Sequence, residues 1–241
     1  MAMLALSKVT KRFGGLEAVK DFDMTVEEGE LVGLIGPNGA GKTTLFNMCA
    51  CFYPPSSGQI LFQGRNIAGL KPYHAARLGI ARTFQVTRPF LDDDVLKNVT
   101  VGAFCHTDDA RAARRIAWEA LETVEFSDRA HVVASELTVA ERKRLELARA
   151  LATQPKLVLV DEVMAGLNPR EKNRVLDILR QIREAGHTLI VVEHDTRAIM
   201  SLCERIVMIH RGEKLVEGPP QQVAHDPQAI AAYLGEDYVA A

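Results

Sequence analysis

A glycine-rich stretch between an apolar run and a helical pattern constrains the fold of this chain more than any other feature. It follows the apolar residues Leu31–Ile35, precedes the helix pattern of 44–48 and reads Gly36-Pro37-Asn38-Gly39-Ala40-Gly41-Lys42-Thr43-Thr44. A buried strand, a glycine loop and a helix start in this order indicate an α/β fold whose loop surrounds phosphate oxygens with backbone N–H groups. In such a loop Lys42 reaches the terminal phosphates, and the Thr43 hydroxyl can ligate Mg2+. The sequence therefore predicts a nucleoside triphosphate as ligand.

Composition narrows the class of protein. The chain has 241 residues, enough for one domain with an inserted subdomain, and 29 Lys+Arg against 31 Asp+Glu give a net charge of -2. That balance provides no global field for nucleic acid, so we expect no nucleic-acid partner. No apolar run is long enough to span a bilayer, and the N-terminus does not read as a secretory signal. Cys49, Cys51, Cys105 and Cys203 lack the spacing of a zinc site and are expected to be reduced thiols in the cytosol.

The first part of the chain predicts antiparallel strands followed by a helical block. Apolar and polar residues alternate up to Val26, as in half-exposed strands, and Ile60–Phe62 is a further short strand. From Tyr73 to Ala152 the pattern is mainly helical, most clearly in 111–124 and 141–152.

The last part predicts a strand, helix, strand unit and a hairpin. Leu157–Val160 and Thr188–Val192 are continuous apolar runs typical of parallel strands covered on both faces, with an amphipathic helix over 173–184 between them. Residues 206–209 and 214–216 flank Arg211-Gly212 as a hairpin.

Three apolar strands each end in reactive side chains. Ile35 leads into the glycine loop, Val160 into Asp161-Glu162, and Val192 into Glu193-His194. Because ligands bind beyond the carboxyl ends of parallel strands, we expect these residues to converge on one site. There Asp161 would hold Mg2+ through water and Glu162 would orient the attacking water, with helix capping or a solvated strand end as the alternative. His194 would contact the terminal phosphate, although a lone histidine at a strand end is also an ordinary structural residue.

With these motifs in this order around a helical block, the chain resembles, nearly end to end, the ATP-binding subunits of ATP-binding cassette (ABC) transporters. Within them it is most similar to the branched-chain amino acid import group, on residues 11–16, 80–85, 165–169 and 232–235. The resemblance implies a P-loop NTPase (RecA-like) core with a mixed sheet, an N-terminal antiparallel β subdomain and an inserted α-helical subdomain. One ABC ATPase domain would cover 1–241, with 1–86 and 153–241 as nucleotide-binding core and 87–152 as helical subdomain.

The resemblance also implies roles for single residues. Phe13 would stack on adenine, with a core-facing strand phenylalanine as the alternative. Gln85 would touch Mg2+ and the attacking water, with a surface amide as the alternative, and Ala165–Asn168 would cross a dimer interface. The implied catalytic residues are Lys42, Gln85, Glu162 and His194, and the implied metal ligands are Thr43, Gln85 and Asp161. The implied nucleotide site comprises all of 36–44 with Phe13, Gln85, Thr138, Asp161, Glu162 and His194.

One motif departs from the family pattern. Where the family has Leu-Ser-Gly-Gly-Gln at the start of a helix, this chain has Leu137-Thr138-Val139-Ala140-Glu141. In the family this helix N-terminus approaches the terminal phosphate of ATP held by the opposite subunit. Thr138 keeps a hydroxyl, but Val139 and Ala140 add side chains and Glu141 adds a negative charge. Val163 also stands where proline usually follows the two acids.

The expected function is therefore an ATP-binding and hydrolysing subunit of an importer for branched-chain or related amino acids. It would be peripheral on the cytoplasmic face of the cell membrane, dimerise with an identical or different ATP-binding subunit, bind integral membrane permease subunits and work indirectly with a solute-binding protein. Residues 86–103 would contact the membrane partners, with ordinary core packing as the alternative. Two other functions remain open: a nucleotide-binding subunit with weak hydrolysis, and a soluble ABC ATPase outside transport.

Overall fold

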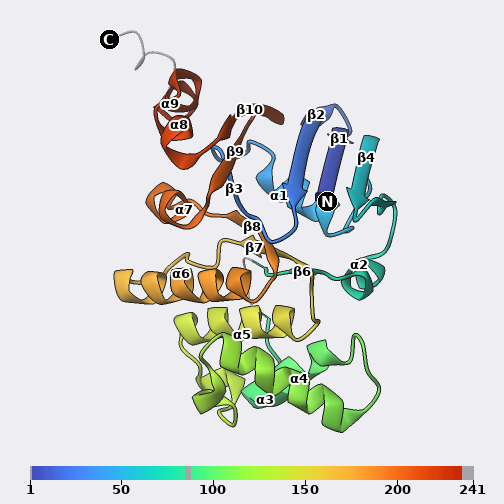
Figure 1. Ribbon diagram of the computed structural model, residues 1–241, viewed down its shortest axis with the longest axis vertical. Coiled ribbons are helices and arrows are strands. Elements are labelled where there is room, and N and C mark those ends of the chain that lie inside the picture. Colours follow the sequence, from blue (N-terminus) through green and yellow to red (C-terminus); the bar gives the residue numbers. More distant parts are fainter. Residues whose placement is uncertain (1, 85–87, 235–241) are drawn as a thin grey trace. The chain divides into compact units, whose positions relative to one another are not determined.

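The computed structural model describes residues 2–84 and 88–234, apart from the side chain of Leu234 (Figure 1). The chain forms two compact units, one made of 1–72 and 188–241 and the other of 73–187. Gln85 and Val86 lie outside the described residues.

The first unit contains an antiparallel sheet near the N-terminus. Its strands lie in the order β2 (Leu16–Glu27), β1 (Ala2–Phe13), β4 (Ser57–Phe62) and β5 (Arg65–Asn66). Buried and exposed residues alternate through the second half of β2, where Phe22, Met24 and Val26 are buried. The predicted half-exposed antiparallel strands are therefore confirmed.

A mixed sheet forms the other part of the first unit. Its strands lie in the order β10 (Glu213–Gly218), β9 (Arg205–His210), β3 (Leu31–Ile35) and β8 (Thr188–Val192). β3 pairs in parallel with both β8 and β9, and every residue of β3 and β8 is buried, as continuous apolar runs predict. β9 and β10 form the predicted hairpin. The unit's helices are α1 (Lys42–Cys49), α7 (Thr196–Leu202), α8 (Pro220–Ala224) and α9 (Pro227–Leu234).

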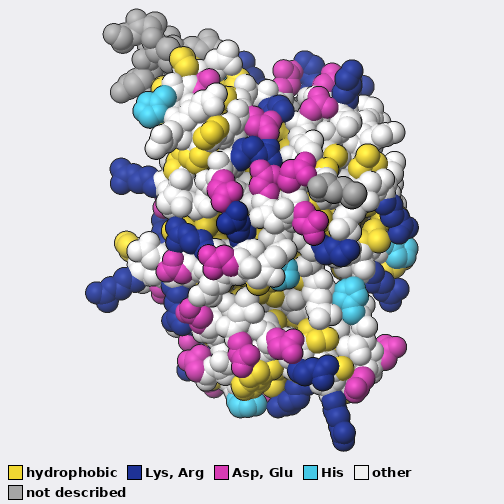
Figure 2. Space-filling model, in the orientation of Figure 1, with side chains coloured by type: hydrophobic (Ala, Val, Ile, Leu, Met, Phe, Trp, Pro, Cys, Tyr) yellow, Lys and Arg dark blue, Asp and Glu magenta, His cyan; other side chains and the backbone are white. Residues whose placement is uncertain are grey.

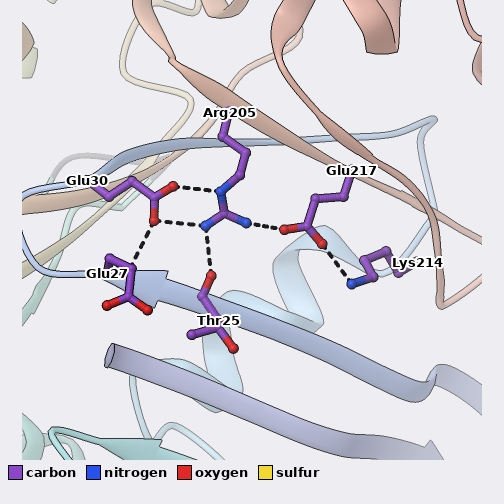
Figure 3. Close-up of polar contacts among 6 residues, drawn as sticks. All are labelled: Thr25, Glu27, Glu30, Arg205, Lys214 and Glu217. Atoms are coloured by element: carbon purple, nitrogen blue, oxygen red, sulfur yellow. Dashed lines mark hydrogen bonds and ion pairs between the residues drawn. The ribbon is translucent and has the colours of Figure 1, made fainter. Parts of the chain in front are cut away.

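A cluster of charged side chains joins the two sheets of this unit (Figure 3). The Arg205 guanidinium of β9 donates to both Glu30 oxygens, at 2.6 and 2.8 Å, and to the Thr25 carbonyl of β2 at 2.7 Å. It also pairs with Glu217 of β10, whose second oxygen accepts from Lys214 at 2.7 Å. Although burial acts to raise it, hydrogen bonds from Arg205 and the Glu27 backbone lower the pKa of Glu30. The cluster therefore fixes β2 against β9 and β10 by charged hydrogen bonds.

The second unit is mainly helical. Its strands β6 (Ile80–Arg82) and β7 (Leu157–Asp161) pair in parallel. Its helices are α2 (Pro72–Leu78), which begins at the unit boundary, α3 (Val95–Ala103), α4 (Ala110–Thr123), α5 (Val139–Leu151) and α6 (Pro169–Glu184), with short 3-10 turns at Ser127–Arg129 and Ala134–Glu136. α3, α4 and α5 lie side by side (Figure 1). The predicted subdomain limits, 87–152, lie inside this unit, which also contains β6, β7 and α6.

Two elements differ from their predictions. β6 lies in the region predicted to be helical. It was not predicted because a strand of three residues is too short to give a periodic signal. α6 begins at Pro169 and not at 173, because Asn168 caps it, Glu171 completes the capping box and Pro169 suits the first helical position. The helices predicted at 111–124 and 141–152 are confirmed as α4 and α5.

The segment predicted to contact membrane partners divides into exposed and buried residues. Phe90 and Leu91 are each 48% exposed, whereas Val95, Leu96 and Val99 are buried in the core. Core packing therefore accounts for these three residues on α3, whereas Phe90, Leu91 and Val101, the last of which is 51% exposed on α3, offer an apolar surface.

The described residues also bear on the predictions made from composition about membrane spans, cysteines and charge. Within 2–84 and 88–234 no helix is both long and apolar enough to cross a bilayer. The four cysteines, all within the described residues, carry thiols that are not joined in disulfides, and burial raises the pKa of the Cys51 thiol to about 11. Acidic and basic side chains are mixed on the face shown in Figure 2.

Candidate nucleotide site

The glycine loop ends at an open helix N-terminus in the first unit. Gly41 is the N-cap residue of α1, with φ 111°, and no side chain caps the helix. The first N–H groups of a helix lack partners within the helix and carry a partial positive charge. The N-terminus of α1 is therefore suited to bind an anion such as phosphate.

Close backbone contacts require glycine at two loop positions. A Cβ on Gly36 would lie 2.1 Å from the Ile209 carbonyl oxygen, and one on Gly41 would lie 2.5 Å from that of Ala18. The Ala40 carbonyl accepts the Gly212 N–H at 2.9 Å. β2, β9 and the β9–β10 turn therefore hold the loop in shape.

Lys42 and Tyr233 hold the first residue of the loop from two sides. Lys42, 6% exposed, donates its Nζ to the carbonyls of Gly36 at 2.6 Å and Pro37 at 2.9 Å. The Gly36 N–H donates to the Tyr233 hydroxyl of α9 at 3.1 Å. Burial raises the pKa of Tyr233, while the hydrogen bond from Gly36 acts to lower it. Sequence reasoning assigned no role to Tyr233, although its motif belonged to the resemblance.

Phe13 lies at the end of β1 with its ring accessible. It is 45% exposed and meets Tyr53 edge to face, with 5.4 Å between ring centroids. The Lys11 Nζ lies 5.2 Å from the Phe13 centroid and 4.9 Å from that of Tyr53. The alternative of a core-facing phenylalanine is therefore wrong, because Phe13 is exposed.

Two other predicted residues of this unit are accessible. Thr43 is exposed in the first turn of α1, and His194 is exposed just before α7. Because β3 and β8 are parallel neighbours, the glycine loop and His194 both follow the carboxyl ends of adjacent strands.

The two predicted acidic residues lie at the end of β7 in the second unit. Asp161 is 4% exposed and pairs with Arg82 of β6 at 2.8 Å. Its N–H donates to the Thr83 hydroxyl at 2.9 Å. Sequence reasoning missed Arg82, because β6 itself was not predicted.

Glu162 has an unusual backbone conformation. Its φ is 48°, in the left-handed region that side-chain-bearing residues rarely adopt, and it is 8% exposed. The Nζ of Lys143, on α5, donates to the Glu162 carbonyl at 3.3 Å. Lys143 was also missed, since a lysine within an amphipathic helix gives no signal in sequence.

The divergent signature, residues 137–141, forms a capping box. Thr138 is the N-cap of α5: its hydroxyl accepts the Glu141 N–H at 3.3 Å, while Glu141 Oε2 accepts from the Thr138 N–H at 2.9 Å and hydroxyl at 3.0 Å. Arg129 pairs with Glu141 Oε1 at 2.9 Å. Burial acts to raise the pKa of Glu141, but the bonds from Thr138 and the charge of Arg129 lower it overall. The Glu141 carboxylate therefore already interacts with Thr138 and Arg129. The N-terminus of α5, unlike that of α1, is capped.

Glu146 of α5 anchors the chain just before the undescribed residues 85–87. Its Oε1 accepts the Phe84 N–H, and its buried Oε2 has no hydrogen-bond partner among the described residues. Burial raises the pKa of Glu146 to about 7, against the Phe84 hydrogen bond and the charges of Lys143 and Arg149. Gln85 follows Phe84 directly, outside the described residues, and the predicted convergence of Asp161 and Glu162 with the glycine loop stays a prediction.

Sequence comparisons identify the family. A family model described as ABC transporter matches residues 19–165, and a model described as branched-chain amino acid ATP-binding cassette transporter matches 213–239. The high-affinity branched-chain amino acid transport ATP-binding protein LivG of Salmonella typhimurium is 37% identical, and BraF of Pseudomonas aeruginosa is 38% identical. Each alignment covers 97% of this chain and 98% of the relative. The lipopolysaccharide export system ATP-binding protein LptB of Escherichia coli is 34% identical over 99% of both chains.

Solved structures agree with the sequence matches. A nucleotide-free ATP-binding cassette from an ABC transporter superposes with a TM-score of 0.89 at 26% identity, covering 98% of this chain and 100% of that one. The ADP conformation of the cassette MJ1267 gives the same TM-score and identity, covering 98% of this chain and 99% of that one. A dimeric post-hydrolysis cassette bound to ADP and Pi has a TM-score of 0.80 at 26% identity, covering 90% and 99%. In sequence and in fold, this chain belongs to the ABC transporter family, as one of its ATPase cassettes.

Proposed function

We propose that this chain binds and hydrolyses ATP as a subunit of an importer for branched-chain or related amino acids. The observation that carries the proposal is the uncapped N-terminus of α1 with Lys42 beside it, in a chain 36 to 38% identical to LivG and BraF. The match of 213–239 to the branched-chain amino acid group supports this substrate class over the export system of LptB.

The residues of the first unit would bind the nucleotide. The loop N–H groups from 36 to 44 would hold phosphate oxygens, and the Lys42 ammonium would exchange its two carbonyl partners for terminal phosphate oxygens. Phe13 would stack on adenine, and His194 would contact the terminal phosphate. Because Mg2+ in nucleotide sites prefers oxygen ligands and keeps several waters besides the phosphates, the Thr43 hydroxyl, the Asp161 carboxylate and the Gln85 amide oxygen would be its protein ligands. Bound Mg2+ would neutralise charge on the phosphates.

The carboxylate of Glu162 would orient the attacking water, assisted by Gln85 and His194. Thr138 would approach the nucleotide of a second ATP-binding subunit, and residues 165–168 would lie at that dimer interface. Dimer closure on ATP would drive permease subunits, and hydrolysis would reset them. In this role the chain would lie at the cytoplasmic face of the membrane as a peripheral subunit and would serve a solute-binding protein indirectly.

Binding and turnover assays on the purified chain test the proposed nucleotide chemistry. We expect MgATP binding by calorimetry and phosphate release in the presence of the second subunit. Lys42→Ala should weaken binding, and Glu162→Gln should bind ATP but accumulate as an ATP-bound dimer on size-exclusion chromatography. A well-folded chain that binds no adenine nucleotide would contradict the proposal.

Uptake by a strain that lacks the gene tests the proposed transport step. Deleting the gene for this chain should abolish high-affinity uptake of labelled leucine, and the wild-type gene, but not Lys42→Ala, should restore it. Normal leucine uptake in the deletion strain would refute the assignment to branched-chain amino acids while leaving ATP binding intact.

The capping box favours a second candidate, a nucleotide-binding subunit with weak hydrolysis. Glu141 already bonds the end of α5 that in the family faces phosphate, and it carries a negative charge. Glu141→Gln keeps an acceptor for Thr138 and removes the charge, so turnover should rise several-fold if this charge limits hydrolysis. Glu136→Gln, a nearby exposed change outside the box, serves as control. Rapid wild-type turnover that Glu141→Gln leaves unchanged would dismiss this candidate.

A further inference from the structure

Lys143 combines two features that ordinary helix lysines lack. Its side chain is buried, with the residue 6% exposed, and its Nζ donates to the main-chain carbonyl of Glu162 at 3.3 Å. Lysine is rarely buried unless its charge is paired or hydrogen-bonded. The position of Lys143 therefore requires an explanation beyond helix solubility.

Glu162 needs support from its surroundings. A non-glycine residue at φ 48° is in an unfavourable conformation that persists only when neighbouring contacts impose it. Two donors converge on its carbonyl oxygen, the Lys143 ammonium and the Ala165 N–H at 3.4 Å. Because a hydrogen bond from a charged group is stronger than a neutral one, Lys143 is the stronger of these two donors.

Neighbouring positions of α5 contact main chain in the same way. Glu146 accepts the Phe84 N–H, and Arg149 donates to the Arg88 carbonyl at 3.0 Å. Lys143, Glu146 and Arg149 follow one another at a spacing of three residues and thus lie along one side of the helix. α5 therefore holds main-chain groups at Glu162, Phe84 and Arg88, and its N-terminus carries Thr138.

We propose that Lys143 is a positioning residue for ATP hydrolysis, which holds the backbone of Glu162 so that its carboxylate is directed at the attacking water. This inference rests on the proposed function, because it requires Glu162 to act in hydrolysis. Lys143 touches neither nucleotide nor water in this role. Its contact joins the helix that carries the divergent signature to the main chain of the residue that bears the proposed catalytic carboxylate.

Steady-state kinetics of the chain with its second subunit test the role. Lys143→Met keeps the length of the side chain but not the donor, so kcat should fall about tenfold while the KM and the Kd for MgATP stay within about twofold. Lys143→Arg, which retains a charged donor, should recover most of kcat. In a Glu162→Gln background, Lys143→Met should cause no further loss of the residual turnover, because it acts through the carboxylate that is already missing.

Arg144→Met is the matched control. Arg144 is the next residue of α5, and it donates to the main-chain carbonyl of Glu125 at 2.9 Å, away from Glu162. Its loss should lower thermal stability without changing kcat. An equal fall of kcat in both variants would overturn the positioning role, as would an additive loss in the Glu162→Gln background.

Hydrogen exchange provides a readout that needs no turnover. Peptides covering 161–165 should exchange faster in Lys143→Met than in Arg144→Met or wild type. Unchanged exchange there would refute the inference whether or not the chain hydrolyses ATP. Wild-type chain that binds no nucleotide, yet shows the expected exchange difference, would contradict the proposed function and leave the Lys143 contact established.

Discussion

At the scale of single residues, Glu146 is a buried carboxyl, with the residue only 7% exposed. One oxygen accepts the Phe84 N–H, the other is buried without a hydrogen-bond partner among the described residues, and burial raises the pKa of the group to about 7. A group whose native pKa is raised takes up a proton on folding between its unfolded and native pKa values. For Glu146 this window extends from about pH 4.5 to about pH 7.

Replacing Glu146 with glutamine should change how stability depends on pH. In the wild type the native state binds one more proton than the unfolded state in this window, so the free energy of unfolding falls as pH rises from 5 to 8. The contribution is about 3 kcal/mol, because the window spans about 2.5 pH units at roughly 1.4 kcal/mol per unit. Glu146→Gln keeps the acceptor for Phe84 and removes the ionisation, so this fall should disappear in denaturant titrations at pH 5 and 8. Glu119→Gln, with a side chain 62% exposed, should behave like wild type; a wild-type pH dependence in Glu146→Gln would contradict the assignment.

At the scale of elements, the Arg205 cluster determines how firmly β2, β9 and β10 are joined (Figure 3). The side chains of Arg205 and Glu30 are only 22% and 17% exposed, so removing one partner leaves the other charge poorly solvated. We expect Arg205→Met to lower the free energy of unfolding by about 2 kcal/mol in urea titrations. Lys20→Met, which breaks the exposed pair with Glu213, should have no measurable effect.

Acid titration examines the same cluster independently. The pKa of Glu30 is lowered from its ordinary value of 4.5, so its stabilisation is present above that pH and is lost as pH falls through the native pKa. Arg205→Met should therefore lose less stability than wild type between pH 5 and pH 3. An equal acid loss in both proteins would show that Glu30 gains nothing from Arg205.

The C-terminal helix α9 contributes a contact to the glycine loop through Tyr233 and Gly36. Tyr233→Phe removes only the hydroxyl that accepts the Gly36 N–H, so the first peptide group of the loop loses its fixed partner. Calorimetry should show MgATP and MgADP binding weakened about three- to tenfold, the loss expected from one hydrogen bond that orders the loop. Tyr73→Phe, at a residue 59% exposed, is the control. Unaltered affinities in a folded Tyr233→Phe variant would mean that this bond does not organise the loop.

At the scale of the whole molecule, the residues assigned to the nucleotide come from both compact units. If residues 36–44 and Asp161-Glu162 serve one nucleotide, MgATP should slow amide exchange in both segments with the same concentration dependence. Lys42→Ala should weaken both effects together. Protection confined to 36–44 would limit the nucleotide to the first unit and reject the assigned roles of Asp161 and Glu162.

The parts of the fold that could be predicted from the sequence are those that a local pattern of residues determines. The glycine loop was predictable because strand, loop and helix are contiguous, and β7, β8 and α4 were predictable from their periodicity. The exposure of Phe90 and Leu91, in contrast to Val95 on the following helix, was not, because tertiary packing decides it. The contacts that hold the candidate site were also beyond sequence reasoning, since their partners are remote: Tyr233 lies 197 positions from Gly36, and Arg82 lies 79 from Asp161.

Any oxyanion that binds at the start of α5 meets a helix end that is already capped. Thr138 and Glu141 satisfy each other at this end of the helix. A phosphate that took the Thr138 N–H or hydroxyl as donor would displace the carboxylate, so binding there would be an exchange of one anion for another. Its affinity would then measure only the difference between two similar interactions, and it would fall as the pH rises enough to keep the resident carboxylate ionised.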